Sequence, residues 1–121
     1  MLIIRKEQMN VLSQYMFKQF IDSMEQHLKK RYPEQTSEMK DGQLRNLIVE
    51  GVEEAKEYDI TDEDDVKRFL EYLVEYGREF GKSSETIWAA ELLNDKELSG
   101  TAKMDEIDNY DFFVISLGKS L

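Results

Sequence analysis

The chain has 121 residues, of which 40% are hydrophobic and 35% are charged, and it contains no cysteine. Its length suits one domain, and without cysteine it can form no disulfide, thiolate zinc site or cysteine nucleophile. Between Met1 and Arg5 only three apolar residues follow one another, too few for a signal peptide. No apolar run reaches the roughly 20 residues that span a bilayer. We therefore expect a single cytoplasmic domain, residues 1–121, with no membrane partner.

The net charge of −10 is concentrated in the second half of the chain. Residues 1–56 carry nine basic and nine acidic side chains, whereas residues 57–121 carry seven basic and seventeen acidic ones. Such a surface repels phosphate backbones, so we expect no binding to nucleic acid. The acidic excess either keeps the domain soluble or attracts a basic protein.

The first predicted helix runs from about Arg5 to Arg31 and ends before Pro33, because the residue before a proline is pushed out of helical geometry. At roughly 40 Å it would be the spine against which the others pack. Its apolar residues recur at spacings of three and four and share one face. They are Met9, Leu12, Met16, Phe20, Met24 and Leu28.

A polar stretch, residues 34–42, connects to a second predicted helix, whose apolar residues fit helical spacing from Leu44 to Ala55. Gly51 lies on its packed face, where a missing side chain lets another helix approach. The third predicted helix begins at Thr61, which forms with Asp64 a pattern that resembles a capping box. We expect this helix to bury Val66, Phe69, Leu70, Leu73 and Gly77.

Residues 87–93 predict a short fourth helix, capped by Ser83 or Ser84. A fifth begins near Thr101 and carries Met104, Ile107, Tyr110 and Val114. The β-branched and aromatic residues 112–117 leave a strand open as an alternative for its last turns. There is no internal repeat and no long linker. The predicted fold is an all-α, single-domain bundle of about five helices with a long N-terminal helix.

Two patterns resemble ligand-binding loops but fail residue by residue. Residues 77–83 resemble the end of a phosphate-binding loop, yet they have three residues between the glycines where that motif needs four, and a helix precedes them. Glycines that end a helix explain them better. The acidic run 62–65 fails the calcium-loop register, which places Asp64 at the glycine and Leu70 at the bidentate glutamate. We predict no nucleotide, metal or other cofactor.

No catalytic constellation is evident, and we predict that the chain is not an enzyme. His27 is the only histidine, has no metal-ligand spacing around it, and reads as a surface residue near the end of the first helix. Carboxylate pairs among Asp105, Glu106, Asp108 and Asp111 leave a small carboxylate-dependent enzyme as an alternative. Such a site would need burial to raise a carboxyl pKa.

Six residues form a hypothetical partner-binding set. Tryptophan is common both in cores and at binding hot spots, so Trp88 fits either place. Ile3 and Ile4 either staple the first helix to the body or form an exposed apolar arm. Three glutamates oppose the buried stripe of the third helix and repel one another, so they either form a solvated face or steer a basic partner. The set is Ile3, Ile4, Glu71, Glu75, Glu79 and Trp88.

Several spaced strings in residues 1–93 resemble a family of small bacterial proteins encoded beside type VI secretion effectors and PAAR-domain spike proteins. The strings are Ile4-Arg5-x-Glu7-Gln8-Met9, His27-Leu28, Tyr32-Pro33-Glu34, Gly51-Val52-Glu53-x-Ala55-x-x-Tyr58-x-Ile60-Thr61 and Trp88-Ala89. The chain departs from the family at Ile87, where a proline is expected, and residues after Asn94 have no counterpart.

The resemblance implies a non-catalytic, cytoplasmic accessory protein that binds another protein. The implied partner is a secreted effector, its loading chaperone or a PAAR-domain protein. The resemblance does not assign the role further, and our leading hypothesis is an adaptor or co-chaperone in loading the effector onto the spike. Immunity proteins, which neutralise a cognate toxin, are encoded in the same places and form the alternative.

Overall fold

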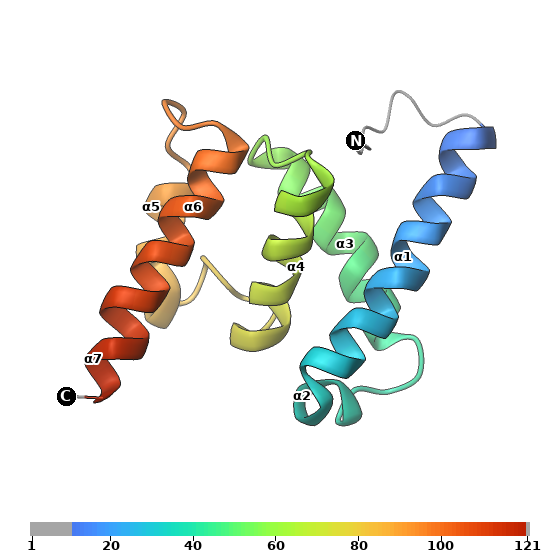
Figure 1. The fold of residues 1–121 in the computed structure, drawn as a ribbon, viewed down its shortest axis with the longest axis horizontal. Coiled ribbons are helices and arrows are strands. Elements are labelled where there is room, and N and C mark those ends of the chain that lie inside the picture. The colour runs from blue at the N-terminus through green and yellow to red at the C-terminus, as the bar shows by residue number, and fades with distance from the viewer. Residues whose placement is uncertain (1–10, 121) are drawn as a thin grey trace.

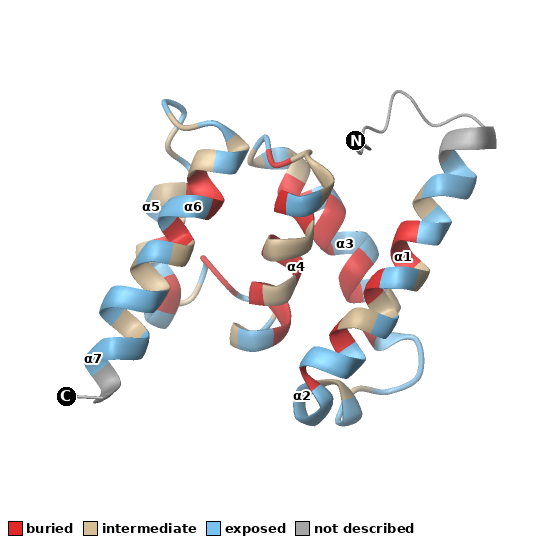
Figure 2. Cartoon of the chain, viewed as in Figure 1, coloured by how far each residue is buried: buried red, intermediate tan, exposed pale blue. Residues whose placement is uncertain are grey.

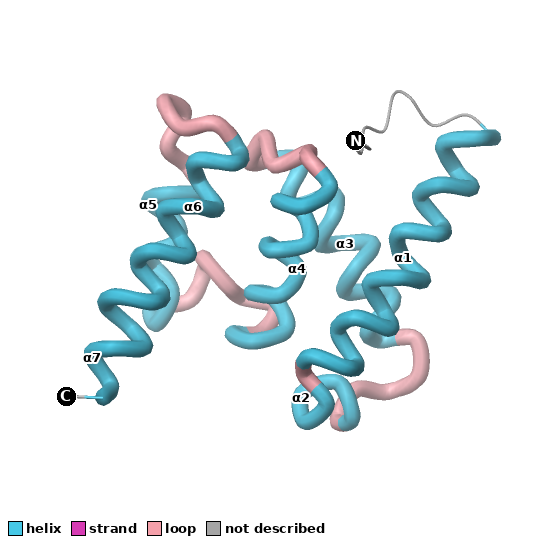
Figure 3. Tube along the Cα trace, viewed as in Figure 1, coloured by secondary structure: helices cyan, strands magenta, loops and turns pink. Residues whose placement is uncertain are grey.

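In the computed structural model, which describes residues 11–120, the regular elements are helices, and no β-strand occurs in that range (Figure 3). The all-α prediction is confirmed. The start predicted at Arg5 lies outside the described residues. The α-helices are α1 (Val11–Arg31), α2 (Pro33–Ser37), α3 (Gln43–Glu57), α4 (Glu63–Tyr76), α5 (Ile87–Leu93), α6 (Gly100–Tyr110) and α7 (Leu117–Ser120).

Helix α4 lies in the middle of the fold, with α1 and α3 on one side and α5 and α6 on the other (Figure 1). A 3-10 turn, Ser84–Thr86, leads into α5. A π-helix, Asp111–Ser116, joins α6 to α7, so α7 lies on the side of the molecule away from α1. No helix within residues 11–120 is both long enough and apolar enough to cross a bilayer.

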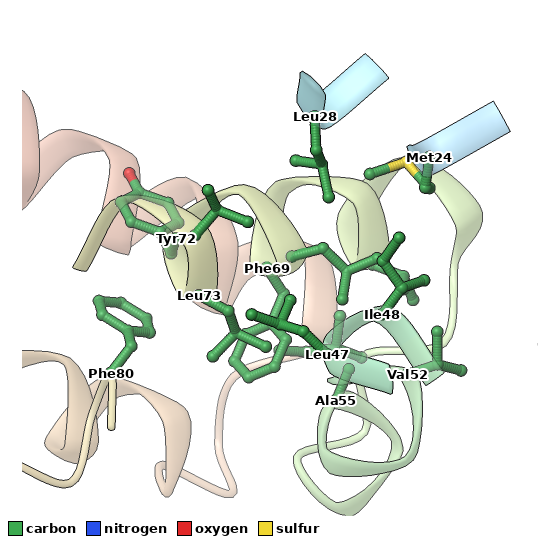
Figure 4. Close-up of a cluster of buried hydrophobic side chains, with 14 of the residues drawn as sticks. Met24, Leu28, Leu47, Ile48, Val52, Ala55, Phe69, Tyr72, Leu73 and Phe80 are labelled. Carbon is green, nitrogen blue, oxygen red and sulfur yellow. The ribbon is translucent and has the colours of Figure 1, made fainter. Parts of the chain in front are cut away.

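The core lies between these helices, on the faces that they turn toward α4 (Figures 2 and 4). The predicted apolar stripe of α3 is buried throughout, and so is that of α4 from Val66 to Leu73. On α1, Phe20, Met24 and Leu28 are buried as predicted, whereas Met16 is exposed.

Gly51 lets α3 approach α4 closely, as its position on the packed face predicts. A Cβ atom at residue 51 would lie 2.5 Å from Leu70 Cδ2 and 2.8 Å from Leu73 Cδ1. Both leucines are fully buried, so they have little room to move. The glycine is required by packing, which outweighs its lower helix propensity.

The ends of α4 differ from the prediction. The helix begins at Glu63 after Asp62, and no side chain caps it, so the capping box of Thr61 and Asp64 does not form. It ends at Tyr76, because Gly77 adopts a φ of 97° that only glycine tolerates easily. Gly77 is therefore exposed and does not belong to the buried stripe.

Three smaller predictions are also corrected. The polar stretch after α1 contains the short helix α2, with Pro33 in its first turn. Ser83 precedes the 3-10 turn without capping it, whereas Ser99 caps α6 by accepting a hydrogen bond from the Ala102 N–H at 3.1 Å. Residues 112–117 are helical, so the strand alternative is wrong.

Candidate protein-binding surface

Polar side chains hold α4 against α6 and the π-helix that follows it. Tyr72 Oη donates to Asp108 Oδ1 at 2.7 Å, and Tyr76 Oη donates to Asp111 Oδ1. Residues four apart on α4 thus meet aspartates three apart on α6 and the π-helix. Both spacings keep the side chains on one face of their helix. The complete set is Arg68, Tyr72 and Tyr76 opposite Asp105, Asp108 and Asp111.

Burial keeps these phenols neutral. It raises the pKa of Tyr72 and of Tyr76 well above the usual range, and the carboxylate that accepts each hydrogen bond raises the pKa further. On the other side of α4, burial and the nearby charge of Glu75 raise the pKa of Tyr32 to about 12. Because both pKa values are raised, the phenols of Tyr72 and Tyr76 remain neutral hydrogen-bond donors at a pH at which a free tyrosine would already ionise.

Trp88 completes an aromatic layer at this junction. Its ring stacks on Tyr110 of α6 with a centroid distance of 4.6 Å, and it meets Tyr76 and Phe80 edge-on at 6.3 and 6.0 Å. Trp88 is half-buried and packs against the hydrophobic core. The tryptophan therefore connects α5 to both α4 and α6 at the edge of the core, where its ring remains partly exposed.

Beyond this aromatic layer, the helical turns that follow α6 expose large apolar side chains. We call residues 112–117 the C-terminal apolar segment. The exposed fraction is 54% for Phe112, 63% for Phe113, 49% for Val114 and 43% for Leu117. No charged residue occurs from 112 to 118 in a chain that is 35% charged. Figure 2 shows these last turns as largely exposed.

Most of this segment is π-helical. The π-helix spans Asp111–Ser116, and the rings of Phe112 and Phe113 meet edge-on with centroids 4.9 Å apart. A π-turn is wider than an α-turn and is rare, and such turns frequently occur at functional sites. The exposed side chains and the unusual backbone thus coincide.

The glutamates of the partner-binding set do not form one ridge. Glu71 Oε2 accepts a hydrogen bond from the His27 ring at 2.7 Å, so it joins α4 to α1. Glu75 is exposed on α4, whereas Glu79 is exposed in the loop after this helix ends at Tyr76. The surface position predicted for His27 is also corrected, because its side chain is only 30% exposed.

Ile3 and Ile4 lie outside the described residues. The loop that resembles a phosphate-binding motif is a turn in which the Gly81 N–H donates to Thr86 Oγ1 at 2.8 Å. Within residues 11–120 no three histidine, aspartate or glutamate side chains converge where a metal ion could be held. The residue patterns did not predict a binding surface at the C-terminal apolar segment. Its lack of charged residues was the signal in the sequence that could have indicated one.

Comparison with known proteins found no matching family model, no similar curated protein and no similar solved structure. The functional conclusion therefore depends on the residues of this chain and on their geometry.

Proposed function

We propose that this chain is a non-catalytic protein-binding domain that docks onto its partner through the C-terminal apolar segment. One observation carries the proposal: four large apolar side chains are about half exposed on consecutive helical turns that have no charge. Monomeric proteins seldom expose a contiguous apolar patch without a use for it. Burying what remains exposed would contribute roughly 1 kcal/mol per side chain, enough to support specific binding.

The partner is a protein with an apolar groove bordered by basic residues. Helical segments with an apolar face commonly bind by lying in such grooves. The basic border follows from the charge of this chain, which is −10 and concentrated in its second half. A second copy would carry the same charge and be repelled. A membrane fits the segment less well than a protein does. Helices that bind membrane surfaces display lysine and arginine on their polar face, whereas Lys103 of α6 is buried and donates to Tyr58 O.

The resemblance of residues 1–93 to type VI accessory proteins indicates which partners to test first. They are a secreted effector, its loading chaperone and a PAAR-domain protein, with the chain as adaptor or co-chaperone. Loss of secretion when the gene is deleted from a donor cell supports that role. Protection of a recipient cell from the toxin would instead make the chain an immunity protein.

Calorimetry with a purified candidate partner tests the docking surface. The double variant Phe112→Ser/Phe113→Ser should keep its circular dichroism and melting temperature, because both side chains are more than half exposed. It should bind about thirtyfold more weakly, since roughly 2 kcal/mol of apolar burial is removed. Tyr15→Ser is the matched control, because Tyr15 is 59% exposed on α1, and its affinity should not change. Equal affinity of the double variant and the parent would refute the proposal.

A further inference from the structure

The C-terminal apolar segment contains a change of helical register. The Asp111 N–H donates to Ile107 O, four residues back, as in an α-helix. The Leu117 N–H donates to Phe112 O, five residues back, as in a π-helix. A π-turn holds more residues than an α-turn, so each residue advances through a smaller angle. Side chains after Asp111 therefore fall behind the directions that a continuation of α6 would give them.

The register decides where Val114 points. The helical spacing of the sequence predicts Val114 on the same stripe as Met104 and Ile107. Counted from Met104 at about 100° per residue, Val114 would lie at about 280° in an uninterrupted α-helix. That direction falls between Lys103 at about 260° and Ile107 at about 300°, and both of these residues are buried. Val114 is instead 49% exposed, so the predicted stripe is interrupted at this residue.

Ile115, the next residue, occupies the inner side of this turn. Within residues 112–118 it is the one residue that is not exposed. The body of the protein therefore still covers the inner side here, and an α register would have covered Val114 as well. The π-helix thus gives up apolar burial and adopts the rarer helical geometry. A local arrangement that costs stability in this way is expected where it serves a function.

We propose that the π-helix brings Val114 into the docking surface, where it contacts the partner beside Phe113. The inference rests on the proposed function, since it takes the partner to be a protein with an apolar groove bordered by basic residues. Phe113 would lie at about 180° from Met104 in an α-helix, so it points outward in either register. Val114 is therefore the residue whose place in the surface depends on the π-helix, and it determines which grooves fit.

Thiol labelling of single-cysteine variants of the full chain tests the register without a partner. The chain has no cysteine, so each variant carries one thiol. Phe113→Cys is the exposed reference, and Ile115→Cys is the covered one. Val114→Cys should react at nearly the rate of Phe113→Cys and at least about threefold faster than Ile115→Cys, because thiol reactivity follows exposure. A Val114→Cys rate equal to that of Ile115→Cys would indicate an α register and would overturn the proposal.

Calorimetry with a purified candidate partner tests the contact itself. Val114→Thr keeps the shape of the side chain and places a hydroxyl in the docking surface. It should bind about fivefold more weakly, because the hydroxyl loses water without gaining a hydrogen-bond partner. Its melting temperature should match that of the parent, because position 114 is exposed. Val49→Thr is the matched control, since Val49 is exposed on α3, which α4 separates from α6 (Figure 1), and its affinity should not change.

The outcomes distinguish this inference from the proposed function. If Phe112→Ser/Phe113→Ser binds more weakly and Val114→Thr binds like the parent, the inference fails and the proposed function stands. If both variants bind like the parent, both fail. A lower melting temperature for Val114→Thr with unchanged affinity would place Val114 in the core and would also overturn the inference.

Discussion

Arg68 pairs with Asp65 of its own helix, α4, and with two aspartates of α6, and replacing it tests how much this ion-pair cluster contributes to stability. Its Nη2 donates to Asp65 Oδ1 at 2.6 Å, and its Nη1 donates to Asp108 Oδ2 at 2.8 Å and to Asp105 Oδ1 at 2.9 Å. The side chain of Asp65 is 6% exposed, whereas those of Asp105 and Asp108 are 61% and 41% exposed. The contact with Asp65 should therefore dominate.

Arg68→Met keeps much of the aliphatic packing and removes the charge. Asp65 then retains only the Thr101 hydroxyl, and an unpaired buried charge costs about 3 kcal/mol or more. The two exposed aspartates can be hydrated, so each should add less than about 1 kcal/mol. We predict a loss of about 3 kcal/mol in the free energy of unfolding, or a melting temperature lower by about 10 °C.

Urea unfolding followed by far-ultraviolet circular dichroism measures this loss. Adding Asp65→Asn to Arg68→Met should restore much of the stability, because the orphaned charge is removed with its partner. Lys18→Met is the control, since the ion pair of Lys18 with Asp22 is largely exposed, and it should leave the midpoint unchanged. A loss below about 1 kcal/mol for Arg68→Met would refute the reasoning.

Three further predictions follow from the structure. Gly100→Ala should destabilise the fold by about 2 kcal/mol or more, because a Cβ would lie 2.5 Å from Asp59 O, whereas Gly118→Ala should be neutral in urea unfolding. Glu71→Lys should lower the melting temperature and Glu79→Lys should not, since only Glu71 is bonded to a second helix; equal effects would contradict this. Because the folded state raises tyrosine pKa values, stability should hold up to about pH 10 and fall between about pH 10 and 12. Tyrosinate absorbance that rises fully near pH 10 while the helix signal persists would disprove it.

Helical periodicity predicted the fold well where a helix buries one continuous stripe. Residues 44–55 match their template, and each of the apolar residues from Leu44 to Ala55 that define the stripe is buried. Helix ends were harder to predict, because they depend on one or two residues. Gly77 continues the helical spacing of α4, yet its positive φ ends the helix there. Because the helix ends there, Glu79 lies in the following loop and Glu71 on α4. The three glutamates predicted to share one helix face therefore do not do so.

Tertiary partners could not be read from the sequence at all. His27 and Glu71 are 44 residues apart and have no shared pattern, yet they are bonded across two helices. The spacing of Asp105 and Asp108 is compatible with a carboxylate pair, whereas both side chains accept hydrogen bonds from Arg68. Exposure is equally hidden, since residues 112–117 have the composition of a buried segment and yet four of them face solvent. Such features follow only from the arrangement of the helices.

Photo-crosslinking in the native cell tests the docking surface most directly. Benzoylphenylalanine can replace Phe113, which is 63% exposed in the C-terminal apolar segment, or Tyr15, which is 59% exposed on α1. The two probes are matched in aromatic character and exposure, so they differ mainly in position. We predict a discrete adduct with another protein from position 113 and none from position 15. No protein adduct from position 113, adducts with lipid or with a second copy alone, or the same adducts from both positions would contradict the account.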